Sequence, residues 1–518
     1  MILTARRSIL LVLLLSIAIP SHGAVYALVI GIDDYRFQRG LYGAVNDARL
    51  IAAALEKAGV ADISLLLNAE ASRAAIEAAW ERMVAKSHPG DTFVVTYAGH
   101  GAQEPDQNRD ETDGKDEVLV LGGFRPQRPG IGERILDDEL NRWFAKVPDR
   151  QILFIADACH SGTLTRGVDP RVGVLSVRTI GDYGPIEDDE LVMPSVSPTH
   201  AIEDLSNVTF FSASRDDQES LELNIDGRPH GALSWAFAAA LGGEGDSNRD
   251  GVLDKGELSH YLIEKVRILV EGKHEPQVIP RGGEEHPLLR LAPRPVIVTP
   301  AQQPLSVHIT GSGPELRRKI RAGLSGIAES PDERGADAVI DLDNRQVLNG
   351  LGDVLSDFGT STATAIQPIL DKQLAVMRLR HLARNPVPMR ILPGDDVHLD
   401  GDIIRLELPV GDLNALTLFN LTGDGTVQLL FPIAGESPLV GNRVFTLPIR
   451  VGPPFGGDHL IGLLTEKPLP ELHATLKSVD GKQKSLTAAQ VLEAEVQNHR
   501  YQLGIAGVYT RPLTRSTR

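Results

Sequence analysis

The sequence is almost without cysteine, because Cys159 is the only one among 518 residues. A single thiol cannot form a disulfide within the chain, so no cysteine framework holds this fold together. The chain also lacks a Lys/Arg-rich tract to offset its formal net charge of −17, which argues against nucleic-acid binding and suits cationic substrates or Ca²⁺. It contains no internal repeat, phosphate-binding loop or dinucleotide fingerprint.

Long hydrophobic runs are missing as well, apart from one at the N-terminus. Met1–Gly23 combines Arg6 and Arg7 with an apolar segment and small residues, the pattern of a secretory signal peptide. We therefore expect an exported protein, periplasmic or extracellular, whose mature chain starts near Ala24 and has no membrane span; an uncleaved N-terminal anchor is the alternative. In an oxidising compartment a lone cysteine indicates a reactive group, with an inert buried cysteine as the alternative.

With 518 residues, 42% hydrophobic and 23% charged, the chain has the length and composition of a globular protein of two to four domains. In its first half, strands of the buried type alternate with amphipathic helices, which predicts an α/β fold with a mostly parallel sheet. The predicted strands are Ala24–Ile32, Ile63–Leu67, Asp91–Tyr97, Ile152–Ile155 and Val208–Ser214, with helices near 41–58 and 71–85.

Two of these strands end in residues that carry chemistry. Asp91–Tyr97 runs into Ala98-Gly99-His100-Gly101, and Ile152–Ile155 runs into Asp157-Ala158-Cys159-His160-Ser161-Gly162. If the strands are parallel neighbours, His100 and Cys159 share the C-terminal edge of one sheet, where open α/β folds place their active sites. A thiol beside an imidazole is a nucleophile with its base. The alternative is that Cys159 is a small core residue and His100 a satisfied loop histidine.

These two motifs, in this order and spacing, resemble those of the caspase-like cysteine peptidases, and among them the metacaspases and bacterial p20-type proteins. The resemblance covers roughly residues 24–270 and implies a caspase-like fold, a mostly parallel sheet flanked by helices. It implies a cysteine endopeptidase with His100 as general base and acid, Cys159 as nucleophile, and the backbone N–H groups of Gly101 and Cys159 as donors to the oxyanion. The alternative is a catalytically quiet scaffold that binds a protein partner in the cell envelope.

The resemblance also implies which bonds would be cleaved. In metacaspases the aspartates at the positions of Asp47 and Asp157 line the pocket for a basic side chain, which implies cleavage after Arg or Lys. Carboxylates at one sheet edge can hold a guanidinium or ammonium group by charge-assisted hydrogen bonds; the alternative for Asp47 is a helix cap. Positions that are commonly cysteine and serine in that pocket are Ala44 and Ala98 here, which leaves room for a different fit. Asp217, after a predicted strand, is a further pocket candidate.

A long polar stretch, Thr163–Asp204, follows the cysteine motif and contains Arg166, Arg171 and Arg178. We call it the connector. Loops of this length are usually functional or disordered. In the enzymes that this chain resembles, the equivalent connector joins the large and small parts of the domain and is a place where self-cleavage can occur. The resemblance therefore makes residues 163–204 the stretch in which to look for self-cleavage.

Acidic residues at two places predict calcium binding. In residues 246–257, oxygen donors stand at loop positions 1, 3, 5, 9 and 12, with glycine at position 6, the pattern of an EF-hand-like loop. We expect a structural Ca²⁺ here, with Asp246, Asn248, Asp250, Val252, Asp254 and Glu257 as ligands. The resemblance to metacaspases adds Asp116, Asp137 and Asp138 as Ca²⁺ ligands. The alternative is that Asp137 or Asp138 caps a helix and that the acidic loop is solvated.

The second half of the chain contains a linker and two further parts, of which the last shows no chemistry of its own. We assign 24–279 to the peptidase domain, the proline-rich stretch 280–304 to a linker, 305–390 to a small α/β module and 391–518 to a β-rich domain, for which a β-sandwich is expected. This last domain resembles a domain of unknown function found downstream of exported bacterial caspase-like domains, and it is a candidate surface for a protein partner. The partner expected for the first domain is a protein or peptide substrate.

Overall fold

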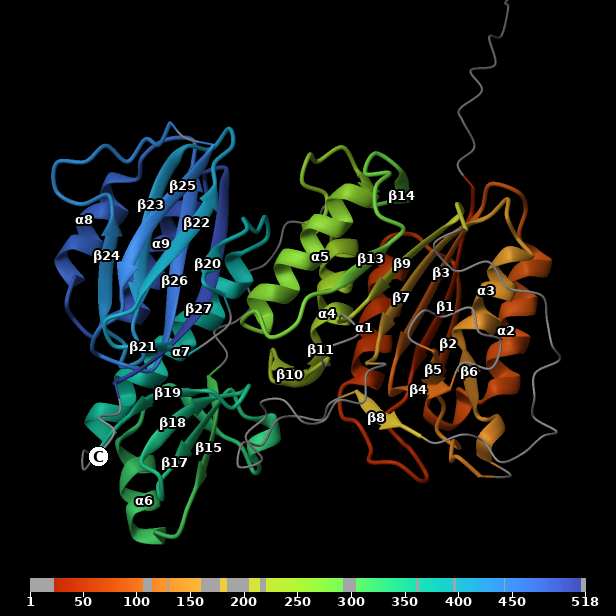
Figure 1. The fold of residues 1–518 in the computed structure, drawn as a ribbon, viewed down its shortest axis with the longest axis horizontal. Coiled ribbons are helices and arrows are strands. Elements are labelled where there is room, and N and C mark those ends of the chain that lie inside the picture. Colours follow the sequence, from red (N-terminus) through yellow and green to blue (C-terminus); the bar gives the residue numbers. More distant parts are fainter. Residues whose placement is uncertain are drawn as a thin grey trace, which may run out of the picture.

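The computed structural model of the chain describes residues 23–105, 114–127, 130–159, 178–183, 205–214, 220–291, 304–359, 363–394, 397–441 and 443–513. These residues form three packed parts, an α/β domain, a small α/β module and a β-rich domain, in chain order (Figure 1). Within the described ranges, no helix has both the length and the apolar character needed to cross a membrane.

A six-stranded sheet forms the centre of the first domain, in the order β13-β9-β7-β3-β1-β2. Its strands are β1 (Val25–Gly31), β2 (Asp62–Leu67), β3 (Thr92–Ala98), β7 (Gln151–Asp157), β9 (Val208–Ser212) and β13 (Gln277–Ile279). All neighbours are parallel except the edge pair β13–β9. The predicted mostly parallel sheet is confirmed, and β3 and β7 are direct neighbours, with Ala98 paired to Asp157.

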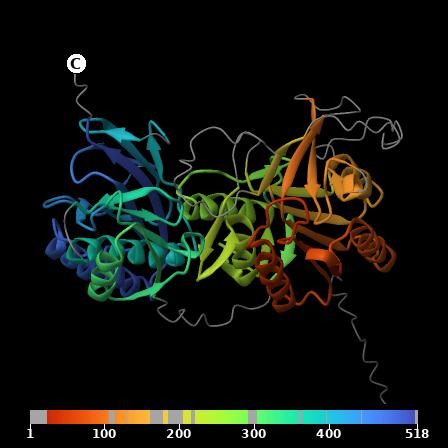
Figure 2. The same cartoon turned by 90° about the horizontal axis from the view of Figure 1, so that it is seen from below.

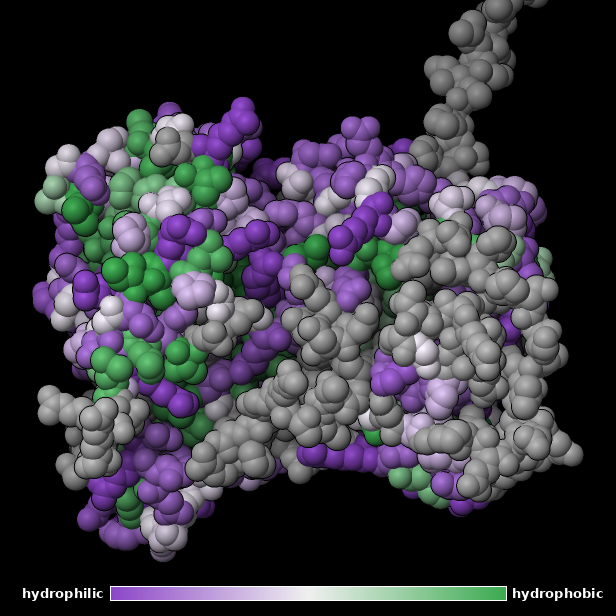
Figure 3. Space-filling model, viewed as in Figure 1, coloured by the Kyte–Doolittle hydropathy of each residue, from purple (hydrophilic) through white to green (hydrophobic). Residues whose placement is uncertain are grey.

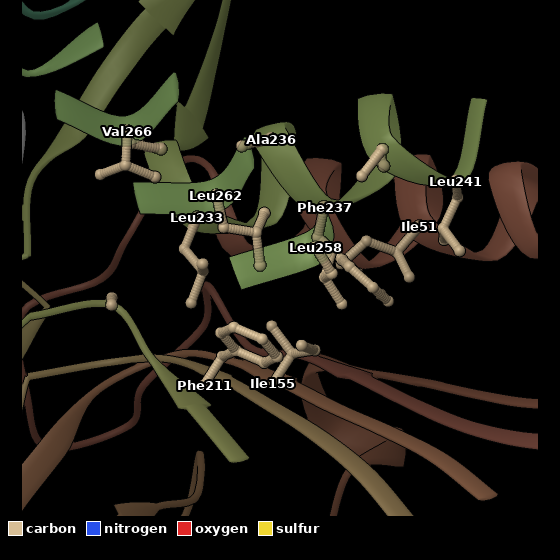
Figure 4. Close-up of a cluster of buried hydrophobic side chains, with 14 of the residues drawn as sticks. Ile51, Ile155, Phe211, Leu233, Ala236, Phe237, Leu241, Leu258, Leu262 and Val266 are labelled. Atoms are coloured by element: carbon tan, nitrogen blue, oxygen red, sulfur yellow. The ribbon is translucent and has the colours of Figure 1, made fainter. Parts of the chain in front are cut away.

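Helices cover both faces of this sheet, because its buried strands carry apolar side chains on both sides. The helices are α1 (Ala44–Lys57), α4 (Ala232–Ala239) and α5 (Lys255–Leu269) on one face, and α2 (Arg73–Lys86) and α3 (Asp137–Ala145) on the other. On the first face, Ile155 and Phe211 of the sheet pack against Phe237 of α4 (Figure 4). On the second, Phe93 packs against Trp80. Figure 2 shows α4 and α5, in light green, between the sheet and the downstream parts.

Two smaller β elements adjoin the C-terminal edge of the large sheet. A four-stranded sheet has the order β6-β5-β4-β8 and consists of β4 (Gly101–Pro105), β5 (Lys115–Val120), β6 (Arg134–Leu136) and β8 (Thr179–Asp182). Strand β8 comes from the connector and runs parallel to β4, with Gly101 paired to Thr179. A hairpin of β10 (Glu222–Ile225) and β11 (Arg228–Gly231) leads into α4. Both elements therefore lie beside the loops that follow the parallel strands of the large sheet.

The stretch predicted as a linker contains a strand. β14 (Pro287–Arg290) pairs with β12 (Val252–Asp254), which precedes α5. Leu288 and Leu289 join the apolar core of the first domain, because they pack with Leu253 and its neighbours. The first domain thus extends beyond the predicted start of the linker at residue 280.

A five-stranded sheet forms the small module, in the order β16-β15-β17-β18-β19, together with helix α6 (Pro314–Gly323). Its strands are β15 (Leu305–Thr310), β16 (Ile327–Glu329), β17 (Ala338–Asp341), β18 (Gln346–Asn349) and β19 (Val354–Asp357). The following helix, α7 (Ala363–Leu382), is shared: Ile366 and Ile369 belong to the core of this module, and Val376 and Leu379 belong to the next core.

Two sheets pack face to face in the β-rich domain, as in a sandwich. One has the order β20 (Arg390–Leu392), β22 (Ile403–Pro409), β25 (Val444–Arg450); the other has the order β21 (His398–Leu399), β27 (Tyr501–Arg511), β26 (Gly457–Thr465), β23 (Ala415–Leu421), β24 (Val427–Phe431). Helices α8 (Pro470–Val479) and α9 (Ser485–Val496) join the end of α7 on the outer face of the larger sheet. The domain is therefore a sandwich with an added helical layer.

Apolar side chains reach the surface of this β-rich domain. Figure 3 shows them in green among hydrophilic residues at the upper left of the view. The exposed large ones in this domain include Ile403, Ile433, Leu439 and Val444. Single exposed apolar residues are ordinary on protein surfaces, so a protein partner for this domain stays a prediction.

A buried carboxylate connects the first domain with the downstream parts. Glu271 follows α5, and its side chain is 1% exposed. It pairs with Arg380 of α7 and accepts a hydrogen bond from the hydroxyl group of Tyr509 in β27. The side-chain amide of Asn349 lies 3.3 Å from the same carboxylate. The three parts therefore meet at one buried acidic group.

Candidate active site

His100 lies just beyond the end of β3 and is held by two tyrosines. Its backbone N–H donates to the Tyr35 hydroxyl at 2.8 Å, and the Tyr97 hydroxyl lies 2.7 Å from its carbonyl oxygen. Ring atom Nε2 lies 2.8 Å from the carbonyl oxygen of Arg39, which can only accept a hydrogen bond. We therefore assign the proton to Nε2. Nδ1, buried and without a hydrogen-bond partner among the described residues, then offers a lone pair.

The burial of His100 has a consequence for stability. Desolvation lowers the pKa of His100 to about 4, although the carbonyl group of Arg39 favours the charged form. Between pH 6.5 and 4 the unfolded chain binds a proton at this residue and the native chain does not, so stability falls as the pH falls.

We expect His100→Gln, which is neutral at every pH, to lose less Tm than the wild type between pH 6.5 and 4.5 in calorimetry. His499→Gln, at an exposed position, is the control and should follow the wild type. Equal slopes for the wild type and His100→Gln would contradict the assignment of a buried neutral imidazole.

Cys159 lies beyond the end of β7, at the same edge of the sheet as His100. Because Ala98 pairs with Asp157, His100 and Cys159 each stand two residues past a paired position. The structure thus brings the two predicted catalytic residues together at one edge. Cys159 is fully buried, and its Sγ atom accepts a hydrogen bond from the backbone N–H of Ser220.

The backbone N–H groups of Gly101 and Cys159 converge on one oxygen atom. Both donate to the carbonyl oxygen of Arg178, each at 3.0 Å. They are the two donors predicted to bind an oxyanion. They meet because the residues that carry them follow adjacent strands. Two N–H dipoles polarise a carbonyl group and would hold the oxyanion of a tetrahedral intermediate more strongly.

The side chain of Arg178 fills an acidic pocket. Its guanidinium group is fully buried and lies 2.5 Å from Asp47 Oδ2, 3.2 Å from Asp157 Oδ1 and 3.2 Å from Glu222 Oε1. A buried charge is costly unless it is paired and hydrogen-bonded. Burial alone would lower the pKa of Arg178, but the carboxylates of Asp157, Asp47 and Glu222 raise it well above its usual range. The pocket therefore matches a permanently charged, planar side chain.

Asp47 belongs to the pocket rather than to the cap of α1. It stands in the first turn of this helix, but the backbone N–H of Ala44 at the start of the helix donates to Asp33, at 2.8 Å. Asp47 Oδ1 lies 2.7 Å from His230 Nδ1, and Asp47 Oδ2 accepts a hydrogen bond from the N–H of Gly231 at 2.9 Å. These neighbours fix the direction of the carboxylate toward the guanidinium group.

Two residues of this site are absent from the sequence-based prediction. Glu222 stands between Leu221 and Leu223, an alternation typical of a strand that exposes its acid to solvent. In the structure it is buried and accepts a hydrogen bond from the N–H of Gly43 at 2.8 Å. Arg178 is one of three arginines in the connector, and nothing in the sequence distinguishes it. Asp217, predicted as a pocket residue, lies outside the described residues.

In the predicted EF-hand-like loop, carboxylates accept hydrogen bonds from backbone N–H groups of the loop itself. Asp246 accepts a hydrogen bond from the N–H of Gly251 at 3.2 Å, and Gly251 has a φ of +81°, which favours glycine. Asp254 caps α5 by accepting from the N–H of Glu257 at 2.7 Å. Val252 begins β12, and the side chains of Asn248 and Asp250 hydrogen-bond within the loop. The loop keeps its turn through its own hydrogen bonds.

The second predicted calcium group is Asp116 on β5 with Asp137 and Asp138 at the start of α3. Burial, followed by the charges of Glu117, Asp116 and Asp138, raises the pKa of Asp137 well above its usual range. One buried carboxylate oxygen of Asp137 has no hydrogen-bond partner among the described residues. Yet no three Asp, Glu, His or Cys side chains in the described ranges are gathered closely enough to hold a metal, so Ca²⁺ binding stays a prediction at both places.

The loop prediction can be tested by melting temperature. We expect Asp246→Asn with Glu257→Gln to remove the Ca²⁺-dependent rise in Tm and to change the Tm in EDTA much less, since each amide loses the charge that binds Ca²⁺ but keeps the size of the side chain and one acceptor oxygen. Asp341→Asn, in a solvated turn of the small module, is the matched control and should keep the rise. A rise of the same size in the double variant would mean that the loop binds no Ca²⁺.

Comparison with known proteins agrees with this geometry. Residues 24–290 match the peptidase family described as "Caspase domain". Metacaspase-1A of Aspergillus terreus is 30% identical over 254 residues, covering 42% of this chain and 62% of that protein. Metacaspase-1 of Emericella nidulans is 30% identical over 257 residues, with the same shares. The chain thus matches 62% of the length of these curated relatives.

Solved structures with partial similarity include protein GSU0716 of Geobacter sulfurreducens, at 20% identity and a TM-score of 0.38, covering 52% of this chain and 100% of that one. Caspase-1 of Spodoptera frugiperda has 11% identity and a TM-score of 0.34, covering 52% of this chain and 91% of that one.

The family match spans more than half of the 518 residues and contains His100, Cys159 and all three pocket carboxylates. The chain therefore belongs to the caspase-domain family of peptidases.

Proposed function

We propose that this chain is a cysteine endopeptidase that cleaves peptide bonds after arginine and, less rapidly, after lysine. The observation that carries the proposal is the placement of Arg178. Its guanidinium group lies among three carboxylates, while its carbonyl oxygen accepts hydrogen bonds from Gly101 and Cys159. A residue that precedes a cleaved bond needs both contacts at once. Lysine carries the charge but not the planar fork that can bind several carboxylates.

The chemistry follows from the same geometry. His100 takes the proton of the Cys159 thiol at Nδ1, and the thiolate attacks the carbonyl carbon of the residue in the acidic pocket. The N–H groups of Gly101 and Cys159 hold the oxyanion, a contribution of roughly 3 kcal/mol per donor. The leaving amine takes the proton from His100, and water then hydrolyses the thioester. The Nε2 hydrogen bond to Arg39 keeps Nδ1 in the form that this sequence of steps needs.

The proposal is tested with fluorogenic peptides that differ only in having Arg, Lys or Asp before the cleaved bond, with and without Ca²⁺. We expect cleavage of the Arg peptide, slower cleavage of the Lys peptide and none of the Asp peptide. Cys159→Ala should be inactive, and an Arg-based irreversible inhibitor should label Cys159 alone. Labelling that persists in Cys159→Ala would overturn the assignment. A folded protein that cleaves no peptide would favour the scaffold alternative.

We also propose that the protein is exported. The support is the pattern of Met1–Gly23, of which residues 1–22 lie outside the described residues. The test is to sequence the N-terminus of the protein isolated from its native cells and to locate it by fractionation. A mature N-terminus near Ala24 in an extracytoplasmic fraction is expected. An intact Met1 in the cytoplasm would refute export.

A further inference from the structure

The hairpin of β10 and β11 supplies three groups to the acidic pocket. Glu222 places its Oε1 atom 3.2 Å from the guanidinium group of Arg178. The backbone N–H of Gly231 donates to Asp47 Oδ2 at 2.9 Å, and His230 Nδ1 lies 2.7 Å from Asp47 Oδ1. Glu222 and Gly231 are paired across the hairpin. One end of the hairpin therefore provides one carboxylate that holds arginine and sets the direction of a second one.

The other end of the hairpin lies against the small module (Figure 1). The side-chain amide of Asn224 donates to Asp337 Oδ1 at 2.8 Å and to the carbonyl oxygen of Gly335 at 3.1 Å. At the turn, Asp226 Oδ1 lies 3.0 Å from Nε2 of His381 on α7. The module and its shared helix thus hold the end of the hairpin that is farther from the pocket.

The geometry of the hairpin connects its two ends. The strands are joined by a two-residue turn, Asp226-Gly227, in which both residues have positive φ values of +55° and +76°. The twist of such a turn matches that of the strand pair. Because side chains alternate along a strand, Asn224 and Glu222 project from the same face of β10, while Leu223 between them packs into the core of the first domain. A displacement of Asn224 would therefore also displace Glu222.

Asp337 is a fixed support for this contact. It is buried, its Oδ2 atom accepts from the N–H of Ser306 at 2.7 Å, and its own N–H donates to the carbonyl oxygen of Ser306 at 2.7 Å. Its carbonyl oxygen accepts from the side-chain amide of Gln373 on α7 at 3.3 Å. A buried carboxylate is stable only when it is hydrogen-bonded, so Asp337 is held in place by β15 on one side and available to Asn224 on the other.

Apolar packing between the hairpin and the module is incomplete. A cavity lies between them, and the apolar side chains that line it include Leu223 and Ile225 of the hairpin, Leu351 of the module and Met377 of α7. Side chains that border a cavity lose part of their packing contacts. The hydrogen bonds of Asn224 therefore hold the hairpin at a place where packing alone is weak.

We propose that Asn224 and Asp337 are positioning residues for arginine recognition, so that the downstream module sets how tightly the acidic pocket binds an arginine side chain. The inference rests on the proposed function and goes beyond it, because Asp337 lies outside residues 24–290, which match the peptidase family. His100 and Cys159 follow β3 and β7, not the hairpin. The thiol and its base should therefore keep their places when the contact with the module is lost.

Binding of a fluorescently labelled arginine peptide measures the affinity of the pocket without catalysis. The measurement uses the full chain with Cys159→Ala and Arg178→Gln, which remove the nucleophile and the internal guanidinium group. In this background, Asn224→Ala should weaken the affinity by about three- to tenfold, the effect of about one hydrogen bond. The matched control is Asn344→Ala, which removes an amide-to-carboxylate hydrogen bond to Asp341 in an exposed turn of the same module. It should leave the affinity unchanged.

An exchange of the two side chains tests whether their contact carries the effect. Asn224→Asp places a second carboxylate against Asp337, so it should weaken the affinity more than Asn224→Ala does. Adding Asp337→Asn restores a donor opposite an acceptor, and the double variant should bind the peptide more tightly than Asn224→Asp alone. Independent effects of the two substitutions would add instead. A double variant that binds no better than Asn224→Asp would refute the positioning contact.

Alkylation of Cys159 by iodoacetamide separates a positioning role from damage to the fold. Cys159 is the only cysteine of the chain, and the neutral reagent does not need the acidic pocket. In protein with Arg178→Gln, addition of Asn224→Ala should leave the rate constant of alkylation unchanged. A change as large as the loss of peptide affinity would mean that the sheet edge itself is disturbed, and would refute the inference.

The peptide measurement also separates this inference from the proposed function. No binding of the arginine peptide to the background protein would refute arginine recognition, and the inference with it. Binding that Asn224→Ala leaves unchanged would refute the inference alone and leave the proposed function standing. The expected result is a selective loss of affinity in Asn224→Ala, with recovery in the exchanged pair and unchanged alkylation of Cys159.

Discussion

His100→Gln is expected to lower kcat for an arginine peptide by about 10²- to 10⁴-fold, the range of general acid–base catalysis. The imidazole both takes the thiol proton and returns a proton to the leaving amine, and an amide side chain can do neither. KM should change little, since the arginine side chain is held by the carboxylates of Asp47, Asp157 and Glu222 and not by the imidazole. The measurement is the steady-state rate of peptide hydrolysis near neutral pH.

His274→Gln is the matched control for this prediction. His274 is also buried in the first domain, its Nδ1 lies 3.0 Å from the carbonyl oxygen of Ala213, and desolvation likewise lowers its pKa to about 4. Its replacement should affect stability while kcat stays within a few-fold of the wild type. An equal loss of kcat in the two variants would contradict a specific role of His100 as general base, because it would show that replacing either buried histidine impairs the enzyme to the same extent.

Gly231→Ala is expected to lower kcat/KM for an arginine peptide by about 10²-fold or more, because it places a methyl group inside the acidic pocket. A Cβ at this residue would lie 2.2 Å from Asp157 Oδ2 and 2.6 Å from Arg178 Nη1. Such distances require the carboxylate or the guanidinium group to move, and losing charge-assisted contacts of this kind costs about 1.5 to 3 kcal/mol each. Peptide kinetics and the rate of inhibitor labelling at Cys159 both report the loss.

The control is Gly242→Ala, whose added Cβ would meet no heavy atom within 4 Å. It should leave kcat/KM near the wild-type value. Thermal melting of both variants separates a blocked pocket from a damaged fold. Full activity of Gly231→Ala toward arginine peptides would show that the substrate arginine does not occupy the place of Arg178.

The local sequence pattern was sufficient to predict which edge of the sheet carries His100 and Cys159. The strands β3 and β7 were recognisable as buried apolar runs, and the polar motifs after them marked where His100 and Cys159 would lie. The two N–H donors were implied by the family resemblance that these motifs carry. The assignment of Asp47 and Asp157 to the pocket came from family resemblance, with charge complementarity in agreement. Apart from Asp47, which lies in the first turn of α1, the signal in each case lies within a few residues of a strand end.

The rest depended on contacts between distant segments. Glu222 follows the alternation of an exposed strand position, and only its packing against Gly43, 179 residues away, buries it. Arg178 stands in a polar connector without periodicity, so its position in the pocket depends on tertiary contacts that the local sequence does not show. The pairing of β12 with β14 was hidden because a proline-rich stretch is also typical of a linker. Burial and long-range pairing decide these positions, and sequence pattern does not encode them locally.

The buried carboxylate of Glu271 shows that the stretch recognised by similarity is smaller than the packed structure to which it belongs. The family match ends at residue 290, yet Arg380 and Tyr509, which hold this carboxylate, lie beyond it. A chain trimmed at that boundary would lose these partners together with the segments that bury Glu271, so its carboxylate would face water instead of the contact between the three parts. The stretch that matches the family and the stretch that packs around Glu271 therefore have different ends.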